Sequence, residues 1–310
     1  MRIMFMGTPE ISAIALKALI GSKHSVIAAV TGEDKPRGRG KQMTPTAVKA
    51  LAEGENITVY TPKTLRDEAF AEVLRCEDPE LIVVVAYGKI LPKYVLDYPK
   101  YGCINLHVSL LPKYRGAAPM QRAVMEGERE TGVTVMHMAE GLDTGDIILQ
   151  QSFPINPTDD FEAIHDRSAE VGSDLLLRAI DEIEAGTATR TKQDDALATY
   201  AKKVEKIDAK IDFTLDSKVL DCIIRGVTPI PGAYCYQDGR MLKIFKAVPT
   251  EKKGRPGEII DADERGEGYF TVACGSGALT VRGVIPEGKG RMSAGDYLRG
   301  RKIKIGDVLE

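Results

Sequence analysis

The 310-residue sequence has no tryptophan, and its five cysteines are scattered. Cys76, Cys103, Cys222, Cys235 and Cys274 are an odd number, and no two of them have the CxxC spacing of a zinc or redox site. This argues against a disulfide framework, and unpaired thiols are typical of proteins from a reducing compartment. We therefore expect a cytoplasmic protein without disulfides and without a metal.

The sequence also lacks a long apolar run and a strong excess of charge. No stretch reaches the roughly 18 apolar residues of a membrane-spanning helix, and residues 1–7 lack the features of a signal peptide. The net charge is −3, from 42 Lys and Arg against 45 Asp and Glu. We expect no membrane partner, and a polyanion would have to bind where positive charge is concentrated locally.

A third absence concerns a glycine motif. Residues 2–30 predict a strand, a helix and a strand, which is the βαβ unit that often binds dinucleotides. The glycine fingerprint of such sites is missing, because Gly7 is followed by Thr8 and Pro9. This disfavours a nicotinamide-dependent oxidoreductase.

Strands and helices alternate through residues 1–186. Residues 81–86 are continuously apolar, which is typical of a parallel strand covered on both faces. The pattern predicts an α/β domain with a Rossmann-like, mostly parallel sheet. Residues 187–203 are polar and predict a linker. Residues 204–310 contain one helix and then short strands separated by turn signals, which predicts a small antiparallel β-barrel.

The rest of the sequence is organised around residues 103–116. Its first half predicts a strand in which Asn105 and His107 share a face, because strand side chains alternate. Pro112 and Gly116 then mark a turn. Open α/β sheets bind ligands where strands end in loops, so a polar pair there indicates a functional site. The alternative is that both side chains only satisfy buried backbone groups.

An acidic turn, residues 141–146, favours the functional interpretation. It follows another apolar strand, and glycines bracket Asp143. A carboxylate within reach of an imidazole fixes its tautomer and supports its cation. Asn105, His107 and Asp143 would then supply a hydrogen-bond donor, a base and an orienting group. None of them is a conventional nucleophile.

Together these motifs resemble one family. Residues 105–112 (Asn-Leu-His-Val-Ser-Leu-Leu-Pro), 115–119 (Arg-Gly-Ala-Ala-Pro) and 142–146 (Leu-Asp-Thr-Gly-Asp) are similar to motifs of the folate-dependent formyltransferases. The resemblance covers essentially the whole chain. It implies that the Asn, His and Asp of these motifs are catalytic, that 10-formyltetrahydrofolate is the co-substrate, and that no metal is needed. It also implies the formyltransferase fold, followed by an oligonucleotide-binding-like (OB-like) barrel.

The same resemblance implies where two substrates bind. The folate pocket would be lined by residues that follow two strands and by one residue of the acidic turn: Val85, Ala86, Tyr87, Gly88, Ser109, Leu110, Leu111, Pro112 and Asp146. The acceptor end of a tRNA would be gripped by the basic, glycine-rich loop of residues 32–42, through Arg37, Arg39 and Lys41. The alternative for this loop is a solvated surface. Ile230 stands where the resemblance leads us to expect tryptophan.

The implied reaction is transfer of the formyl group to the α-amino group of initiator methionyl-tRNA, for translation initiation, by a cytoplasmic monomer. An α-amino group has a pKa of about 7.7–8.0, so part of it is neutral near pH 7 and can attack the formyl carbon directly. Asn105 would donate a hydrogen bond to the tetrahedral oxyanion. His107 would accept the amine proton or stabilise the oxyanion as a cation, and the sequence does not choose between these roles.

Other functions stay open from the sequence. The formyl acceptor could be a purine-pathway amine, an amino sugar or water, although the basic loop and the barrel favour tRNA. A catalytically silent tRNA-binding module could keep the same fold. The presence of Asn105, His107 and Asp143 argues against that module.

The basic loop gives a first testable prediction. If Arg39 contacts a phosphate, Arg39→Ala should raise the Michaelis constant for tRNA. It should also reduce the slope of log affinity against log salt by about 0.7 on a single strand or about 0.9 on a duplex. Folate binding should hardly change. A salt titration beside the wild type measures the slope, and identical slopes with identical tRNA kinetics would assign the loop to solvated surface.

Overall fold

The computed structural model describes residues 1–37, 42–300 and 303–310, which form two compact units. The first unit comprises Met1–Gly116, Glu130–Phe153 and His165–Ala201. The second comprises Ala117–Arg129, Pro154–Ile164 and Lys202–Glu310. Most of the segment that the sequence assigns to a linker therefore belongs to the first unit.

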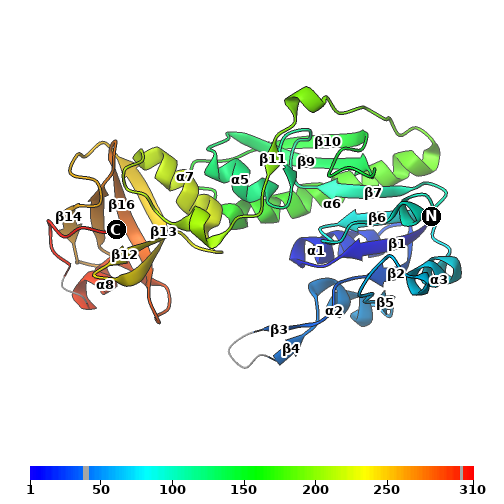
Figure 1. Cartoon of the computed structure of the whole chain (residues 1–310), viewed down its shortest axis with the longest axis horizontal. Helices are drawn as coiled ribbons and strands as arrows, with labels where there is room; N and C mark the ends of the chain where they lie inside the picture. Colours follow the sequence, from blue (N-terminus) through cyan, green and yellow to red (C-terminus); the bar gives the residue numbers. More distant parts are fainter. Residues whose placement is uncertain (38–41, 301–302) are drawn as a thin grey trace. The chain divides into compact units, whose positions relative to one another are not determined.

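A seven-stranded sheet forms the centre of the first unit (Figure 1). Its order is β10-β9-β7-β6-β1-β2-β5. The bounds are β1 Arg2–Gly7, β2 Ser25–Val30, β5 Thr58–Tyr60, β6 Leu81–Val85, β7 Cys103–His107, β9 Glu130–His137 and β10 Ile147–Pro154. Strands β5, β2, β1, β6 and β7 pair in parallel, and β9 runs antiparallel to β7. The mostly parallel sheet predicted from the sequence is confirmed.

Helices follow the strands as the alternating pattern predicts. Those of the first unit are α1 Glu10–Ile20, α2 Ala47–Gly54, α3 Glu68–Glu77, α4 Lys93–Leu96 and most of α6 Phe161–Ala185. Two of them start at side-chain caps, where Thr46 accepts a hydrogen bond from Lys49 N and Asp67 accepts one from Phe70 N, both at 3.1 Å. These caps satisfy amides that the first turn of a helix leaves free.

Helix α6 covers one face of β7 and leaves the other face to the polar residues. A Cβ added at Gly172 would lie 3.0 Å from Leu106 Cδ2, so the helix packs closely on Leu106. Leu106 lies between Asn105 and His107 in the strand, and strand side chains alternate. Asn105 and His107 therefore project from the face opposite α6.

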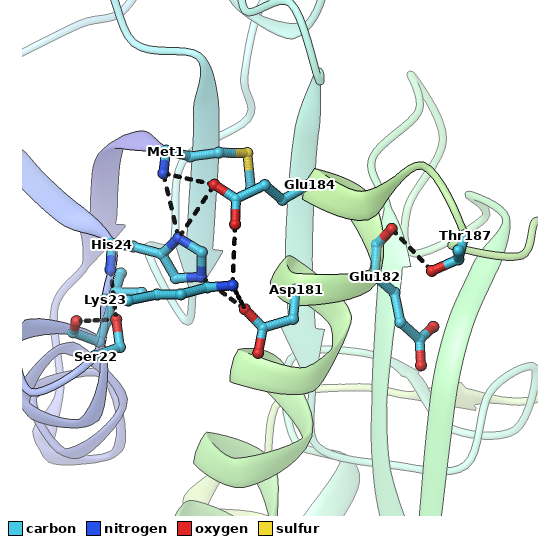
Figure 2. Close-up of polar contacts among 9 residues, drawn as sticks. Met1, Ser22, Lys23, His24, Asp181, Glu182, Glu184 and Thr187 are labelled. Carbon is cyan, nitrogen blue, oxygen red and sulfur yellow. Dashed lines mark hydrogen bonds and ion pairs between the residues drawn. The ribbon is translucent and has the colours of Figure 1, made fainter.

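An ion-pair cluster fastens the end of α6 to the turn between α1 and β2 (Figure 2). Lys23 Nζ lies 2.9 Å from Asp181 and 3.1 Å from Glu184, and its hydrogen bond lowers the pKa of Asp181. His24 Nε2 lies 3.2 Å from Asp181. The imidazole and the two carboxylates have ligand atoms close together, but the Lys23 ammonium and the amino group of Met1, 3.0 Å from Glu184, already pair with the carboxylates. The contacts are explained as an ion-pair network and give no reason to expect a metal.

Short elements complete the first unit. They are the antiparallel pair β3 Lys35–Arg37 and β4 Gln42–Thr44, the parallel pair β8 Arg115–Gly116 and β11 Tyr200–Ala201, and the 3₁₀ turn η1 Asp195–Leu197. Arg37 thus ends a strand of the basic loop, whereas Arg39 and Lys41 lie outside the described residues.

The second unit contains a sheet of order β12-β13-β16-β15-β14, with β17 paired to β16. Its strands are β12 Tyr234–Gln237, β13 Arg240–Thr250, β14 Ile259–Asp263, β15 Tyr269–Ala273, β16 Ala278–Pro286 and β17 Met292–Ser293. Its other elements are α5 Pro119–Met125, η2 Lys206–Ala209, α7 Ser217–Val227 and α8 Ala294–Gly300. The pairs of successive sheet neighbours are antiparallel, as predicted for this part of the chain.

The last residues of the chain bond to both edges of this sheet. Tyr236 N of β12 donates to Glu310 O at 2.7 Å, and Ile259 N of β14 donates to Asp307 O at 2.8 Å. The edge amides of two strands are thereby satisfied by one segment. No helix in the described part of the chain is both long and apolar enough to cross a bilayer.

The packing of α5 on α7 gives a stability prediction. A Cβ at Gly226 of α7 would lie 2.5 Å from Met125 Cγ and 2.9 Å from Gln121 O. Gly226→Ala should therefore lower the free energy of unfolding by about 1–3 kcal/mol, as overpacked sites do. The matched control is Gly54→Ala at the end of α2, where a Cβ meets nothing within 4 Å.

Thermal unfolding of both variants beside the wild type checks this prediction. We expect a lower midpoint for Gly226→Ala and an unchanged or slightly higher one for Gly54→Ala, because alanine favours helix more than glycine does. Equal midpoints for the two variants would contradict the close packing at Gly226.

Candidate active site

Strand β7 places Asn105 and His107 at the carboxyl end of the central sheet. Asn105 lies beside Val84 of β6 and opposite Met136 of β9, and His107 lies opposite Thr134. His107 is only 6% exposed, whereas Asn105 is half-buried. The Asn105 side chain makes no hydrogen bond within residues 1–37, 42–300 and 303–310, so its amide N–H groups are available to a ligand.

The two ring nitrogens of His107 have different partners. Nε2 lies 3.0 Å from the carbonyl oxygen of Tyr114, and Nδ1 lies 3.7 Å from Asp143 Oδ2. A carbonyl can only accept, so Nε2 carries a proton and donates it to Tyr114. Nδ1 is then the nitrogen that can gain or lose a proton, and the nearby carboxylate would stabilise the resulting cation.

The acidic turn is held so that Asp143 faces His107. The backbone N–H of Gly116 donates to Asp143 Oδ2 at 2.8 Å, and His137 N donates to Asp146 O at 2.9 Å across the base of the turn. The chain approaches itself so closely that a Cβ at Gly145 would lie 1.7 Å from His137 O. Glycine is therefore required at that position.

The loop after β7 is fixed by a buried threonine. Thr134 Oγ1 donates to Ser109 O at 2.6 Å and accepts from Leu111 N at 3.2 Å. Gln150 Nε2 donates to Leu111 O at 2.8 Å from the neighbouring strand. These bonds hold the segment from Ser109 onward directly after His107, where the sequence predicts part of the folate pocket.

A second predicted pocket segment leaves the sheet at the same edge. Val85 is the last residue of β6, which pairs in parallel with β7, and residues 86–88 follow it. Ser12 Oγ donates to Val85 O at 2.6 Å and Thr8 Oγ1 donates to Tyr87 O at 3.3 Å, so the start of α1 holds this segment. The Tyr87 hydroxyl is buried and has no partner within the described ranges, and burial raises the pKa of Tyr87 to about 12.

The structure brings several predicted site residues together. Asn105, His107 and Asp143 lie in one cluster, and the two loop segments leave neighbouring strands. Asp146 lies at the base of the acidic turn. The assignment of catalytic and folate-binding roles to these residues stays a prediction, as does the assignment of tRNA contacts to Arg37, Arg39 and Lys41.

The sequence did not reveal the side chains that support this cluster. Gln150 and Thr134 come from β10 and β9, and Gln193 comes from the predicted linker. Arg115 is inside a quoted motif, but its burial, at 2% exposed, could not be inferred from the sequence. Isolated polar residues in polar or alternating stretches carry no pattern, so only the fold identifies them.

Comparisons with known proteins show the family of this chain. Residues 1–180 match the family model described as formyl transferase, and residues 203–302 match the formyl transferase C-terminal domain. Proteins named methionyl-tRNA formyltransferase are similar over the whole chain. That of Citrifermentans bemidjiense is 46% identical over 100% of this chain and 96% of its own length. That of Lachnospira eligens is 45% identical over 100% and 99%.

Solved structures share the fold at lower identity. An N-formyltransferase from Helicobacter canadensis, in complex with folinic acid and dTDP-3-aminofucose, has a TM-score of 0.67 and 21% identity, covering 90% of this chain and 97% of that chain. HypX from Aquifex aeolicus, in complex with tetrahydrofolic acid, has a TM-score of 0.64 and 20% identity. The match covers 96% of this chain and 47% of HypX. At this identity the likeness establishes the fold alone.

The contact with Tyr114 predicts the tautomer of His107. Neutral His107 should carry its proton on Nε2, because the carbonyl beside Nε2 needs a donor. Nitrogen-15 NMR of the labelled imidazoles distinguishes the two tautomers, and a His107→Gln variant assigns the signal. A neutral ring protonated on Nδ1 would contradict the arrangement.

Proposed function

The chain belongs to the formyl transferase family, and within it we propose that this protein transfers the formyl group of 10-formyltetrahydrofolate to the α-amino group of initiator methionyl-tRNA. The reaction would serve translation initiation. The observation that carries this proposal is the identity of 45–46%, over the whole chain, to relatives named methionyl-tRNA formyltransferase. The sugar-modifying relatives have identities of only 19–21%.

The chemistry requires no nucleophile from the protein. The neutral amine attacks the formyl carbon, a C–N bond forms, and the carbonyl oxygen becomes an oxyanion. Collapse of this intermediate breaks the bond to the folate nitrogen, which leaves with a proton. The free Asn105 amide suits the role of oxyanion donor, because such a donor acts where charge develops.

His107 and Asp143 would manage the proton of the amine. Nε2 is committed to the Tyr114 carbonyl, so proton exchange would take place at Nδ1. The 3.7 Å separation between Nδ1 and Asp143 Oδ2 exceeds a hydrogen bond, and a substrate group or water can lie beside both. This arrangement supports two roles of His107 equally. The ring could act as a base at Nδ1, or as a cation that stabilises the oxyanion.

The folate would bind along the edge where β6 and β7 end. Two observations support this location: residues 85–88 and Ser109–Pro112 leave adjacent parallel strands, and ligands of open α/β sheets bind outside such ends. The half-buried Asp146 would complete the pocket from the acidic turn. Folate is consumed as a co-substrate, and the residues of this site give no reason to expect a metal.

We assign tRNA recognition to the basic loop and to residues 204–310. Under this proposal residues 1–186 are catalytic, residues 187–203 connect, and the C-terminal sheet is an OB-like barrel. The bonds of Asp307 and Glu310 to both edge strands support a nearly closed sheet. Ile230 is 73% exposed, so this position offers an apolar surface instead of the indole that the family resemblance implies. We propose a cytoplasmic monomer.

The proposed function is tested by incubation with 10-formyltetrahydrofolate and charged initiator tRNA. We expect formylmethionyl-tRNA and tetrahydrofolate in equal amounts. Parallel reactions replace the tRNA with a dTDP-linked amino sugar or with a purine-pathway amine, and one reaction contains no acceptor. Formylation of one of these acceptors but not of tRNA, or folate release without an acceptor, would overturn the proposed acceptor.

Asn105→Ala tests the oxyanion role. The turnover number should fall by about 10²–10³, because one preorganised donor is lost. The Michaelis constants should change little, because the charge appears only in the transition state. The matched control is Asn156→Ala, which should leave turnover unchanged, because the Asn156 amide bonds to Asp159 in the second unit and to no other side chain among the described residues. A folded Asn105→Ala with turnover within twofold of the wild type would refute the role.

A further inference from the structure

The segment after α6 is bound to the active-site loops along its length. Thr191 exchanges two backbone hydrogen bonds with Ile147, at 2.9 and 2.8 Å. Thr199 O accepts from Arg115 N at 2.8 Å, and Thr199 Oγ1 accepts from Tyr114 N at 2.8 Å. Ala201 then pairs with Gly116 in the parallel ladder of β11 and β8. Residues 191–201 are therefore bonded within the first unit.

Gln193 lies in the middle of this segment and bonds through both ends of its amide. Nε2 donates to the carbonyl oxygens of Asp143 and Gly145, each at 2.8 Å. Oε1 accepts from Arg115 Nε at 3.1 Å and from Arg115 Nη2 at 2.8 Å. Carbonyls only accept and guanidinium only donates, so one amide orientation satisfies all four bonds and the flipped one satisfies none.

We propose that Gln193 is a positioning residue of the active site, which holds the acidic turn so that the Asp143 carboxylate faces His107. Two hydrogen bonds hold Asp143: Gln193 donates to its carbonyl oxygen, and Gly116 N donates to its carboxylate. Arg115 orients Gln193 and is itself buried, and it also pairs with the carboxylate of Asp195, which is 82% exposed. The guanidinium therefore bonds both to this carboxylate and to the Gln193 amide oxygen.

This inference rests on the proposed function, because its readout is formyl transfer. Gln193 touches no reacting atom and acts through the carboxylate of Asp143. A misplacement of about 1 Å at such a group can cost on the order of 10² in rate. The effect of Gln193 on turnover should therefore depend on that carboxylate, whereas a merely structural contribution should not.

A double-mutant cycle with Asp143→Asn tests this dependence. Gln193→Met keeps the length of the side chain and removes these four bonds, together with the contact from Nε2 to Met136 Sδ at 3.8 Å. We expect turnover to fall by about 10- to 100-fold in the wild-type background. In the Asp143→Asn background the same change should cost less than about twofold, because coupled residues are not additive. The Michaelis constant for tRNA should stay the same.

Two further variants make the test specific. Gln193→Glu keeps an acceptor for Arg115 but loses the donor to the two carbonyls, so it should behave like Gln193→Met. Gln151→Met is the matched control, since Gln151 is exposed and its amide donates to Ser152 O alone within the described part of the chain. Its turnover should equal that of the wild type. Thermal unfolding reports whether each variant is folded, and Gln193→Glu serves if Gln193→Met is not.

The outcomes separate the two proposals. Unchanged turnover in a Gln193 variant, or an equal loss in both Asp143 backgrounds, would overturn the positioning role. Wild-type activity of Gln193→Glu would also overturn it, because the donor would be dispensable. If the wild-type protein does not formylate methionyl-tRNA, the proposed function fails instead.

Discussion

The hydrogen bond between His107 and the carbonyl of Tyr114 constrains the rest of the site. A buried carbonyl needs a donor, and Nε2 supplies it at 3.0 Å. This fixes the ring and leaves only Nδ1, beside Asp143, for proton exchange. Tyr114 is itself held by a residue that is distant in the sequence, because its backbone N–H donates to Thr199 Oγ1. The tautomer of His107 therefore depends on a segment that is more than 80 residues away in the sequence.

The acidic turn can reach His107 only because the chain folds back over the sheet. In the antiparallel register His107 lies opposite Thr134, and Ile104 lies opposite His137, so β9 ends near the start of β7. The step from Ile104 to His107 covers about 10 Å along the strand, so the turn must run back over this distance before Asp143 can reach His107. The close approach at Gly145 and the Gly116 N–H make this return possible.

The sequence predicted the parallel sheet, the strand that carries Asn105 and His107, and the turn that carries Asp143. Periodicity and turn residues encode these features locally, and the structure brings the three side chains together. The contacts of Gln193 could not be predicted, because its partners are 48–78 residues distant and its surroundings are polar like those of a linker. The bonds of Asp307 and Glu310 to the two edge strands of the C-terminal sheet likewise could not be predicted, because these residues follow no strand pattern.

If the transfer needs no protein nucleophile, its rate depends on how precisely the side chains of the site are positioned. Arg115 and Gly116 each contribute to the positioning of Asp143. The planar guanidinium of Arg115 directs two N–H groups at one oxygen of Gln193, which a lysine could not reproduce. The backbone N–H of Gly116 holds the Asp143 carboxylate. Gly116 has φ 117° and a Cβ there would lie 2.9 Å from Ala201 O, so no other residue fits this strand pair. One dipeptide thus fixes both ends of Asp143.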